Sequence, residues 1–285
     1  MGANTKIEWT RGDDGTPGAT WNPVTGCTHV SEGCRNCYAE RVLPRTGQSF
    51  DKVVCHPGRL DAPLHWKKPR RIFVNSLSDL FHPDVPASFI TDCFEVMGAC
   101  PHHTFQILTK RPERVESVLY GPDGNWFLGG NDWYPNIWLG FSAENQQTFD
   151  SRWACFGKWA YALNLFASLE PLLGPITCVF EHDTAQLRWV IVGGESGLGA
   201  RPMHPDWARS LRDQCTAAGV PFFFKQWGNH CWPDQMTLET FRRIDAAVNL
   251  GNVPDDVYDV GKKAAGRLLD GRTWDELPKT KGVER

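Results

Sequence analysis

The sequence lacks long apolar runs and an excess of charge of either sign. No stretch of about eighteen apolar residues occurs, so no membrane-spanning helix is expected. Residues 1–14 contain no apolar segment of the kind that signal peptides carry. The 30 Lys and Arg nearly balance the 33 Asp and Glu, for a net charge of −3, which gives no general attraction to nucleic acid or membrane. We therefore expect a soluble, cytoplasmic protein with no membrane partner.

Internal repeats and low-complexity segments are also absent. What recurs is a short β-branched or aromatic run, then a polar turn, then an amphipathic stretch, and this order predicts parallel strands joined by helices. A length of 285 residues suits one α/β barrel. We therefore expect an α/β fold, a partial or complete (β/α) barrel. The expected strands are 20–25, 72–75, 104–109, 137–142, 164–168, 189–193 and 221–225, and the expected helices include 87–99, 111–120 and 205–218.

The strand pattern stops after residue 228. We expect the barrel to occupy residues 1–228, with clustered cysteines in a loop at 26–38. The remainder, 229–285, is expected to form a helical extension packed on the barrel, with helices near 235–247 and 255–269.

Polar residues follow six of the expected strands. Because the carboxyl ends of parallel strands form the active site in α/β folds, six such ends predict one polar cavity. The residues concerned are Ser76, Ser78, Asp79, Lys110, Ser142, Glu170, Glu195 and Lys225. Structural roles also stay open for some of them. Lys110 can be a surface lysine, Glu170 can cap a turn, and Glu195 can pair with Arg201 to shape its loop.

Three of the ten cysteines lie close together in the sequence. Cys27, Cys34 and Cys37 form a C-x6-C-x2-C motif, whereas the other seven are scattered, and most of those are expected to be small buried side chains. Disulfides are not expected in a cytosolic chain. Three thiolates can hold three irons of a 4Fe–4S cluster, and the fourth iron then stays open to S-adenosylmethionine.

Structural zinc is the competing interpretation of the same cysteines. Zinc takes four ligands, and His29 or the pair Cys55-His56 would complete the set. Zinc modules usually carry two paired knuckles, and this sequence has one, so cysteine spacing favours the iron–sulfur cluster.

The motifs resemble those of a phage-associated family with three clustered cysteines, whose function is uncharacterised. The resemblance covers nearly the whole chain. It rests on the runs TWNPVTGC (20–27), GCRNCYAE (33–40), LTKRP (108–112), SLEPLLGP (168–175), VGGESG (192–197) and FKQWG (224–228).

The order of features is also similar to spore photoproduct lyase and other radical S-adenosylmethionine enzymes. Their final two cysteines and following tyrosine match Cys34-x2-Cys37-Tyr38. A Ser-Asp strand end matches Ser78-Asp79, a Thr-Lys that holds the carboxylate of S-adenosylmethionine matches Thr109-Lys110, and a serine near the nucleoside matches Ser142. The resemblance implies a 4Fe–4S cluster, S-adenosylmethionine and an external electron donor on a radical-SAM-like barrel.

Three departures separate this chain from the lyase. Six residues lie between the first two cysteines where the lyase has three, which changes the loop but not the number of ligands. Ser76 stands where the lyase has its hydrogen-donating cysteine, and Asn36 stands where it has a tyrosine. A serine hydroxyl gives up a hydrogen atom less readily than a thiol. Repair of thymine dimers by the lyase mechanism is therefore not expected.

These patterns predict a radical S-adenosylmethionine-type enzyme, lyase- or transferase-like. Its expected substrate is a nucleic-acid base or nucleotide, in a phage, DNA-modification or repair context. Catalytic roles are expected for Ser76, Tyr38 and Glu195, and cofactor contacts for Ser78, Asp79, Lys110, Ser142, Glu170 and Lys225. The alternative is a non-catalytic iron–sulfur or zinc-binding barrel that recognises nucleic acid or a protein partner encoded nearby.

Overall fold

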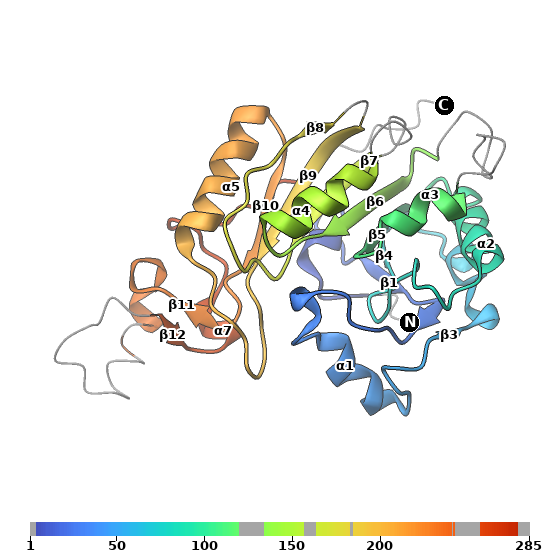
Figure 1. Ribbon diagram of the computed structural model, residues 1–285, viewed down its shortest axis with the longest axis horizontal. Coiled ribbons are helices and arrows are strands. Elements are labelled where there is room, and N and C mark those ends of the chain that lie inside the picture. The colour runs from blue at the N-terminus through green and yellow to red at the C-terminus, as the bar shows by residue number, and fades with distance from the viewer. Residues whose placement is uncertain are drawn as a thin grey trace.

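Seven parallel strands form one curled sheet, an open half-barrel (Figure 1). The computed structural model describes residues 4–119, 134–156, 164–182, 185–240, 242 and 257–278. The α/β barrel prediction is confirmed in its partial form. Along the sheet the strands are β1 (Ala19–Trp21), β4 (Arg71–Val74), β5 (Thr104–Thr109), β6 (Ile137–Ser142), β7 (Asn164–Leu169), β9 (Ala185–Gly193) and β10 (Phe222–Gln226).

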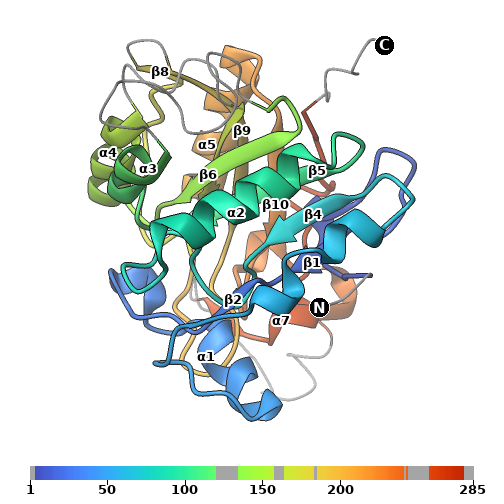
Figure 2. The same cartoon turned by 90° about the vertical axis from the view of Figure 1, so that its right-hand side faces the viewer.

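Four helices connect these strands and cover the outer face of the sheet (Figure 2). Three were expected, and the fourth, α4, is short and polar and was not. Its start is fixed by Asn145, whose side chain accepts a hydrogen bond from the Thr148 amide in a capping box. The helices are α2 (Ala87–Gly98), α3 (Glu113–Leu119), α4 (Gln146–Trp153) and α5 (Pro205–Ala218).

Short elements make up the loops. Helix α1 (Tyr38–Val42) directly follows the segment with the three clustered cysteines, and the C-terminal part contains α7 (Lys262–Ala265). Within the described residues, no helix has the length and hydropathy to span a bilayer. The remaining elements are β2 (Val24–Thr25), β3 (Val54–Cys55), β8 (Glu181–His182), β11 (His230–Cys231), β12 (Tyr258–Asp259), η1 (Glu8–Thr10), η2 (Glu32–Cys34), η3 (Leu43–Thr46), η4 (Pro57–Arg59), η5 (Ala62–His65), η6 (Ala154–Phe156) and η7 (Pro233–Gln235).

Side chains alternate between the two faces of the sheet, as the two-residue period of a strand requires. On β4, Ile72 and Val74 pack outward beneath the helices, while Phe73 packs inward. The inner face carries an aromatic cluster that Trp9 of η1 completes. Trp9 is 3% exposed, so the N-terminal segment closes the inside of the half-barrel.

The first expected strand is divided in two. β1 ends at Trp21, and β2 starts at Val24 and pairs antiparallel with β3. The Asn22-Pro23 step lies between them, and Pro23 has no amide hydrogen to donate to a ladder. The amide of Val24 instead donates to Asn75 Oδ1 at 3.1 Å.

The prediction of a helix near 255–269 is wrong for residues 257–269. β12 and the four-residue α7 lie there, because Gly261 and Gly266 adopt φ of 77° and 70°, which ends a helix on either side. Beyond them, Trp274 O accepts from the Phe224 amide at 2.8 Å, so this segment covers the edge of β10. The helix expected at 235–247 falls mostly outside the described residues, and the domain boundary at 228 stays a prediction.

Candidate functional site

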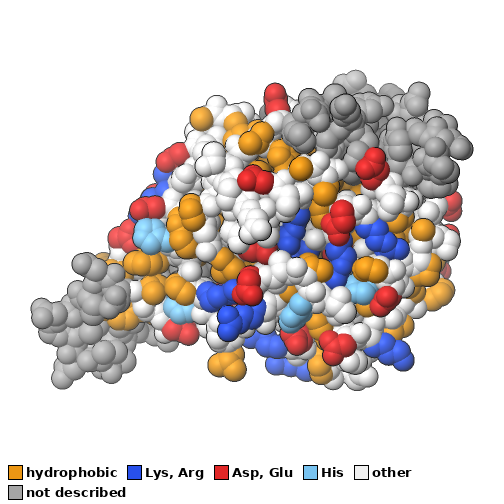
Figure 3. All heavy atoms as spheres, viewed as in Figure 1, with side chains coloured by type: hydrophobic (Ala, Val, Ile, Leu, Met, Phe, Trp, Pro, Cys, Tyr) orange, Lys and Arg blue, Asp and Glu red, His pale blue; other side chains and the backbone are white. Residues whose placement is uncertain are grey.

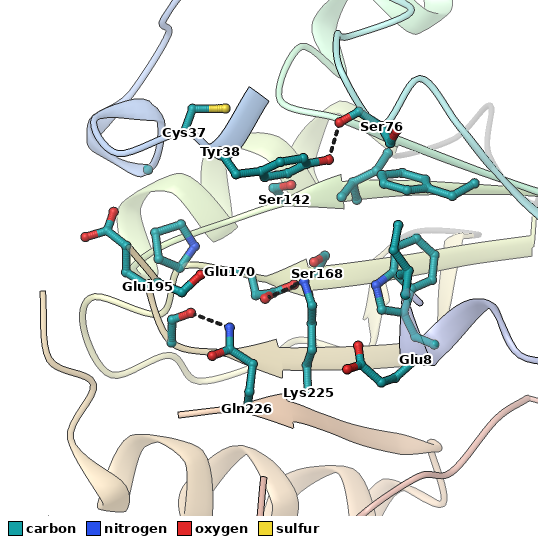
Figure 4. A pocket seen from close by; sticks show the side chains of 18 of the residues that line it. Glu8, Cys37, Tyr38, Ser76, Ser142, Ser168, Glu170, Glu195, Lys225 and Gln226 are labelled. Atoms are coloured by element: carbon teal, nitrogen blue, oxygen red, sulfur yellow. Dashed lines mark hydrogen bonds and ion pairs between the residues drawn. The ribbon is translucent and has the colours of Figure 1, made fainter. Parts of the chain in front are cut away.

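A cavity of about 670 Å³ opens at the carboxyl ends of the strands (Figure 4). It brings together eight of the predicted site residues, whereas Cys27, Cys34, Ser78 and Asp79 do not line it. In Figure 1, α1 lies below the sheet, at the end toward which the arrowhead of β6 points. The predicted residues in the lining are Cys37, Tyr38, Ser76, Lys110, Ser142, Glu170, Glu195 and Lys225.

Strand alternation explains why these side chains converge. Phe166 lies in the inner aromatic cluster, and Ser168 and Glu170 follow it at steps of two. In the same way Lys225 follows the inward Phe223 on β10. β7 and β10 therefore each contribute an aromatic residue to the inner cluster and polar residues to the wall of the cavity.

Lys225 and Glu170 form an ion pair inside the cavity. The Lys225 ammonium lies 2.9 Å from both Glu170 oxygens, and the two side chains are 22% and 17% exposed. A Cβ at Gly193 would lie 2.6 Å from Glu170 Oε1, so the glycine leaves space for the carboxylate. The pair is neutral overall and open to a ligand on one side.

Tyr38 reaches across the cavity from the cysteine segment. Its hydroxyl donates to the backbone carbonyl of Ser76, and the Ser76 hydroxyl donates to Asn22 Oδ1 at 3.1 Å. Burial of the Tyr38 hydroxyl raises its pKa, and the neighbouring charges of Cys37 and Glu170 raise it further. Tyr38 is therefore a neutral phenol at physiological pH.

Asp79 supports the cavity wall from behind. Its carboxylate accepts from Thr109 Oγ1 at 2.8 Å and from the Lys110 amide at 3.0 Å, which fixes the backbone that carries the Lys110 side chain. Ser78 Oγ donates to Val24 O at 2.8 Å. Both residues join neighbouring chain segments, and their direct contact with a cofactor stays a prediction.

The three cysteines lie on one loop beside the cavity. Cys34 is buried, and Cys27 and Cys37 pack partly exposed against the apolar cluster of Ala39, Leu43 and Phe50. In kind and number these thiols fit three sites of a 4Fe–4S cluster. Within the described residues, however, no three Cys, His, Asp or Glu side chains are gathered as a metal-binding group.

Cys27 lies near two charged side chains, Asp79 and Arg111. Burial and the Asp79 carboxylate raise the pKa of its thiol, while Arg111 opposes them. Arg111 Nη1 lies 3.5 Å from Cys27 Sγ as a hydrogen-bond donor. Iron binding would have to displace the thiol proton, and the arginine is placed to stabilise the resulting thiolate.

The two histidines suggested as a fourth zinc ligand have other partners. His29 Nε2 lies 3.2 Å from Glu40 Oε2, and His56 Nε2 lies 2.8 Å from Thr25 Oγ1. Five of the scattered cysteines are buried, as expected, and burial raises the pKa of the Cys178 thiol to about 12. These five thiols are unreactive at neutral pH.

Three arginine–carboxylate pairs surround the cysteine loop (residues 26–38). They are Arg111–Asp79, Arg152–Glu144 and Arg201–Glu195, with N···O distances of 3.2, 2.9 and 2.7 Å. Among them, Arg201–Glu195 was one of the alternatives that the sequence left open. The other two arginines were not found from sequence, because nothing in the local pattern marks the partner of a lone arginine.

A family comparison identifies the chain. Residues 4–278 match the family described as protein of unknown function, DUF5131. The chain belongs to the DUF5131 family. Among curated proteins none matches this sequence.

Solved structures similar to this DUF5131 protein include forms of spore photoproduct lyase. A point mutant of the lyase aligns with 15% identity and a TM-score of 0.45, covering 75% of this chain and 63% of that one. A double mutant with bound AdoMet and dinucleoside spore photoproduct gives 15% and 0.43, covering 83% and 62%. This chain thus spans less than two thirds of their length, and so remote a likeness says nothing about its reaction.

The DUF5131 chain should lose stability in acid. Burial raises the pKa of Glu144 and of Glu195, but hydrogen bonds from Ser31 and Arg152 to the first, and from Arg201 and Asn36 to the second, outweigh burial and hold each pKa below its usual value. A carboxyl with a lowered folded pKa stabilises the fold fully above its unfolded pKa, about 4.3, and loses this as the pH falls through the folded value.

We therefore expect the midpoint of thermal unfolding to fall as the pH drops from about 5 to 3. Removing the carboxyl in Glu195→Gln should flatten this dependence. An unchanged pH profile in that variant would contradict the assignment.

Proposed function

We propose that this protein is an iron–sulfur enzyme of the radical S-adenosylmethionine type that acts on a nucleobase or nucleotide-like substrate. The observation that carries the proposal is the meeting of the cysteine loop with the polar strand ends. Cys37 and Tyr38 line the same cavity as Lys110, Ser142 and Glu170. A cluster on that loop would face an open cavity of a size that suits small ligands.

In this proposal Cys27, Cys34 and Cys37 hold the cluster. When bound, the cluster supplies the electron that splits S-adenosylmethionine into methionine and a deoxyadenosyl fragment able to take hydrogen from a substrate. Lys110 supplies a positive charge for the carboxylate of the cofactor. Within the described residues the Lys110 ammonium has no ion-pair partner, so its charge is available to a ligand.

The opposite side of the cavity suits the substrate. Four strand steps separate β5, which carries Lys110, from β10, which carries Lys225, and at about 4.8 Å a step this is roughly 19 Å along the sheet. The Lys225–Glu170 pair offers a donor and acceptors to a ring edge, and Tyr38 offers an aromatic face. On the face drawn in Figure 3, Lys and Arg side chains are interspersed with Asp and Glu, so we assign recognition to the cavity.

The test is cleavage of S-adenosylmethionine by anaerobically reconstituted protein with dithionite. We expect methionine and 5′-deoxyadenosine as products. In Lys110→Met the KM for S-adenosylmethionine should rise about tenfold or more, because a charge-assisted contact is lost. Lys67→Met, an exposed lysine outside the cavity, is the matched control and should behave as wild type.

A protein that holds a cluster yet cleaves no S-adenosylmethionine would contradict the proposal that it is an enzyme of this type. The alternative, an iron–sulfur barrel that only binds nucleic acid or a partner, would then be favoured. Zinc is disfavoured by the occupied His29 and His56 side chains. Metal analysis that shows zinc without iron would instead favour zinc over the iron–sulfur cluster.

A further inference from the structure

Each of the three arginine–carboxylate pairs also bonds the cysteine loop. Arg111 Nη2 donates to Thr28 O at 2.8 Å, and Arg152 Nη2 donates to Ser31 Oγ at 3.0 Å. Arg201 Nη2 donates to Glu32 O at 2.8 Å. The loop is therefore tied at three successive points to carboxylates that follow strands β4, β6 and β9.

The carboxylates themselves reach the loop as well. The Gly33 amide donates to Glu144 Oε1 at 3.4 Å, and a Cβ at Gly33 would lie 3.0 Å from that carboxylate. Asn36 Nδ2 donates to Glu195 Oε2 at 2.9 Å. A residue on either side of Cys34 is thus fixed directly to a buried acid.

Burial makes these pairs costly unless every polar group is satisfied. Glu144 is fully buried, and Arg111 and Arg152 are 4% and 7% exposed. Removing charges from water is repaid only when geometry and additional hydrogen bonds are good. The loop supplies part of those bonds, so the loop and the pairs stabilise one another without any metal.

We propose that the three pairs form a metal-independent clamp that assembles the cysteine loop before the cluster binds, and that Arg111 in addition tunes the bound cluster through Cys27. Many small metal sites fold only when metal is added. Here side chains of the protein itself hold the loop at three points. The first part stands without the proposed function, and the second part rests on it.

The clamp is tested by amide hydrogen exchange of residues 27–37 in chelator-treated, metal-free protein. The wild-type loop should be protected, and Arg201→Met should exchange at least about tenfold faster there. Arg201 is 25% exposed, so its loss should disturb the fold less than Arg152→Met, which removes one partner of a pair whose two side chains are both buried. Arg209→Met is the matched control, because Arg209 pairs with Asp206, Asp234 and Asp270 away from the loop.

Free exchange in the metal-free wild-type loop, or an unchanged loop in Arg201→Met, would overturn the clamp. A protected loop in a protein that takes up no iron would support the clamp and refute the proposed function. The two failures are therefore distinguishable.

The action of Arg111 is tested by the reduction potential of the reconstituted cluster. Hydrogen bonds to the cluster sulfurs and nearby positive charge stabilise the reduced cluster, which carries the extra electron, and so raise its reduction potential. Arg111→Met should therefore shift the potential to more negative values, Arg111→Lys should recover part of the shift, and Arg209→Met, whose ion pairs lie away from the loop, should leave it unchanged. Equal potentials in wild type and Arg111→Met would refute this part. If Arg111 only held the loop in place, Arg111→Met and Arg111→Lys would not differ in reduction potential.

Discussion

Cys34→Ala is expected to abolish iron binding and, with it, cleavage of S-adenosylmethionine. Cys34 is 9% exposed and ends η2, between two segments that the arginine clamp holds. Two remaining thiols cannot hold three irons. Substituting a residue that only hydrogen-bonds to a metal ligand lowers metal affinity or activity by about 10- to 100-fold. The loss of a ligand itself should have a larger effect.

Iron content and 5′-deoxyadenosine formation measure this effect. Cys100→Ala is the matched control, since Cys100 is also buried but lies after α2, away from the loop. Unfolding curves of both variants establish that each is folded. Full iron content in Cys34→Ala would contradict its assignment as a ligand.

Trp9→Ala should be the most destabilising single substitution considered. The indole is 3% exposed and meets Phe73 and Trp189 with ring centroids 4.7 and 6.2 Å apart. Deleting a buried aromatic side chain costs about 3–5 kcal/mol. For a chain of this size that corresponds to a fall in the unfolding midpoint of roughly 6–20 °C.

The same residue lines the floor of the cavity, so the substitution also opens the site from below. Trp9→Phe keeps an aromatic ring and should recover much of the stability. Thermal unfolding followed by circular dichroism compares the three proteins. A shift of under about 2 °C in Trp9→Ala would mean that the N-terminal segment does not close the half-barrel.

The strands and the polar cavity could be predicted because both depend on local pattern. Short apolar runs at 104–109 and 137–142 gave two strands with their observed bounds. Side-chain alternation along a parallel strand then requires Ser142, Glu170 and Lys225 to face one mouth. Such features need no knowledge of distant contacts.

Features that depend on distant contacts could not be predicted in this way. Trp9 packs against strands far along the chain, and no periodicity surrounds it in the sequence. Arg152 is separated by 121 residues from the Ser31 hydroxyl it bonds. The pattern over 255–269 predicts a long helix, whereas Gly261 and Gly266 confine α7 to four residues.

The central claim is that the cysteine loop holds a 4Fe–4S cluster, and the most direct test is the absorbance and metal content of protein purified without oxygen. We predict a brown protein with a broad band near about 400 nm and about four irons and four sulfides per chain, lost in Cys34→Ala. A colourless wild-type protein that contains zinc, or no metal even after anaerobic reconstitution, would contradict the claim.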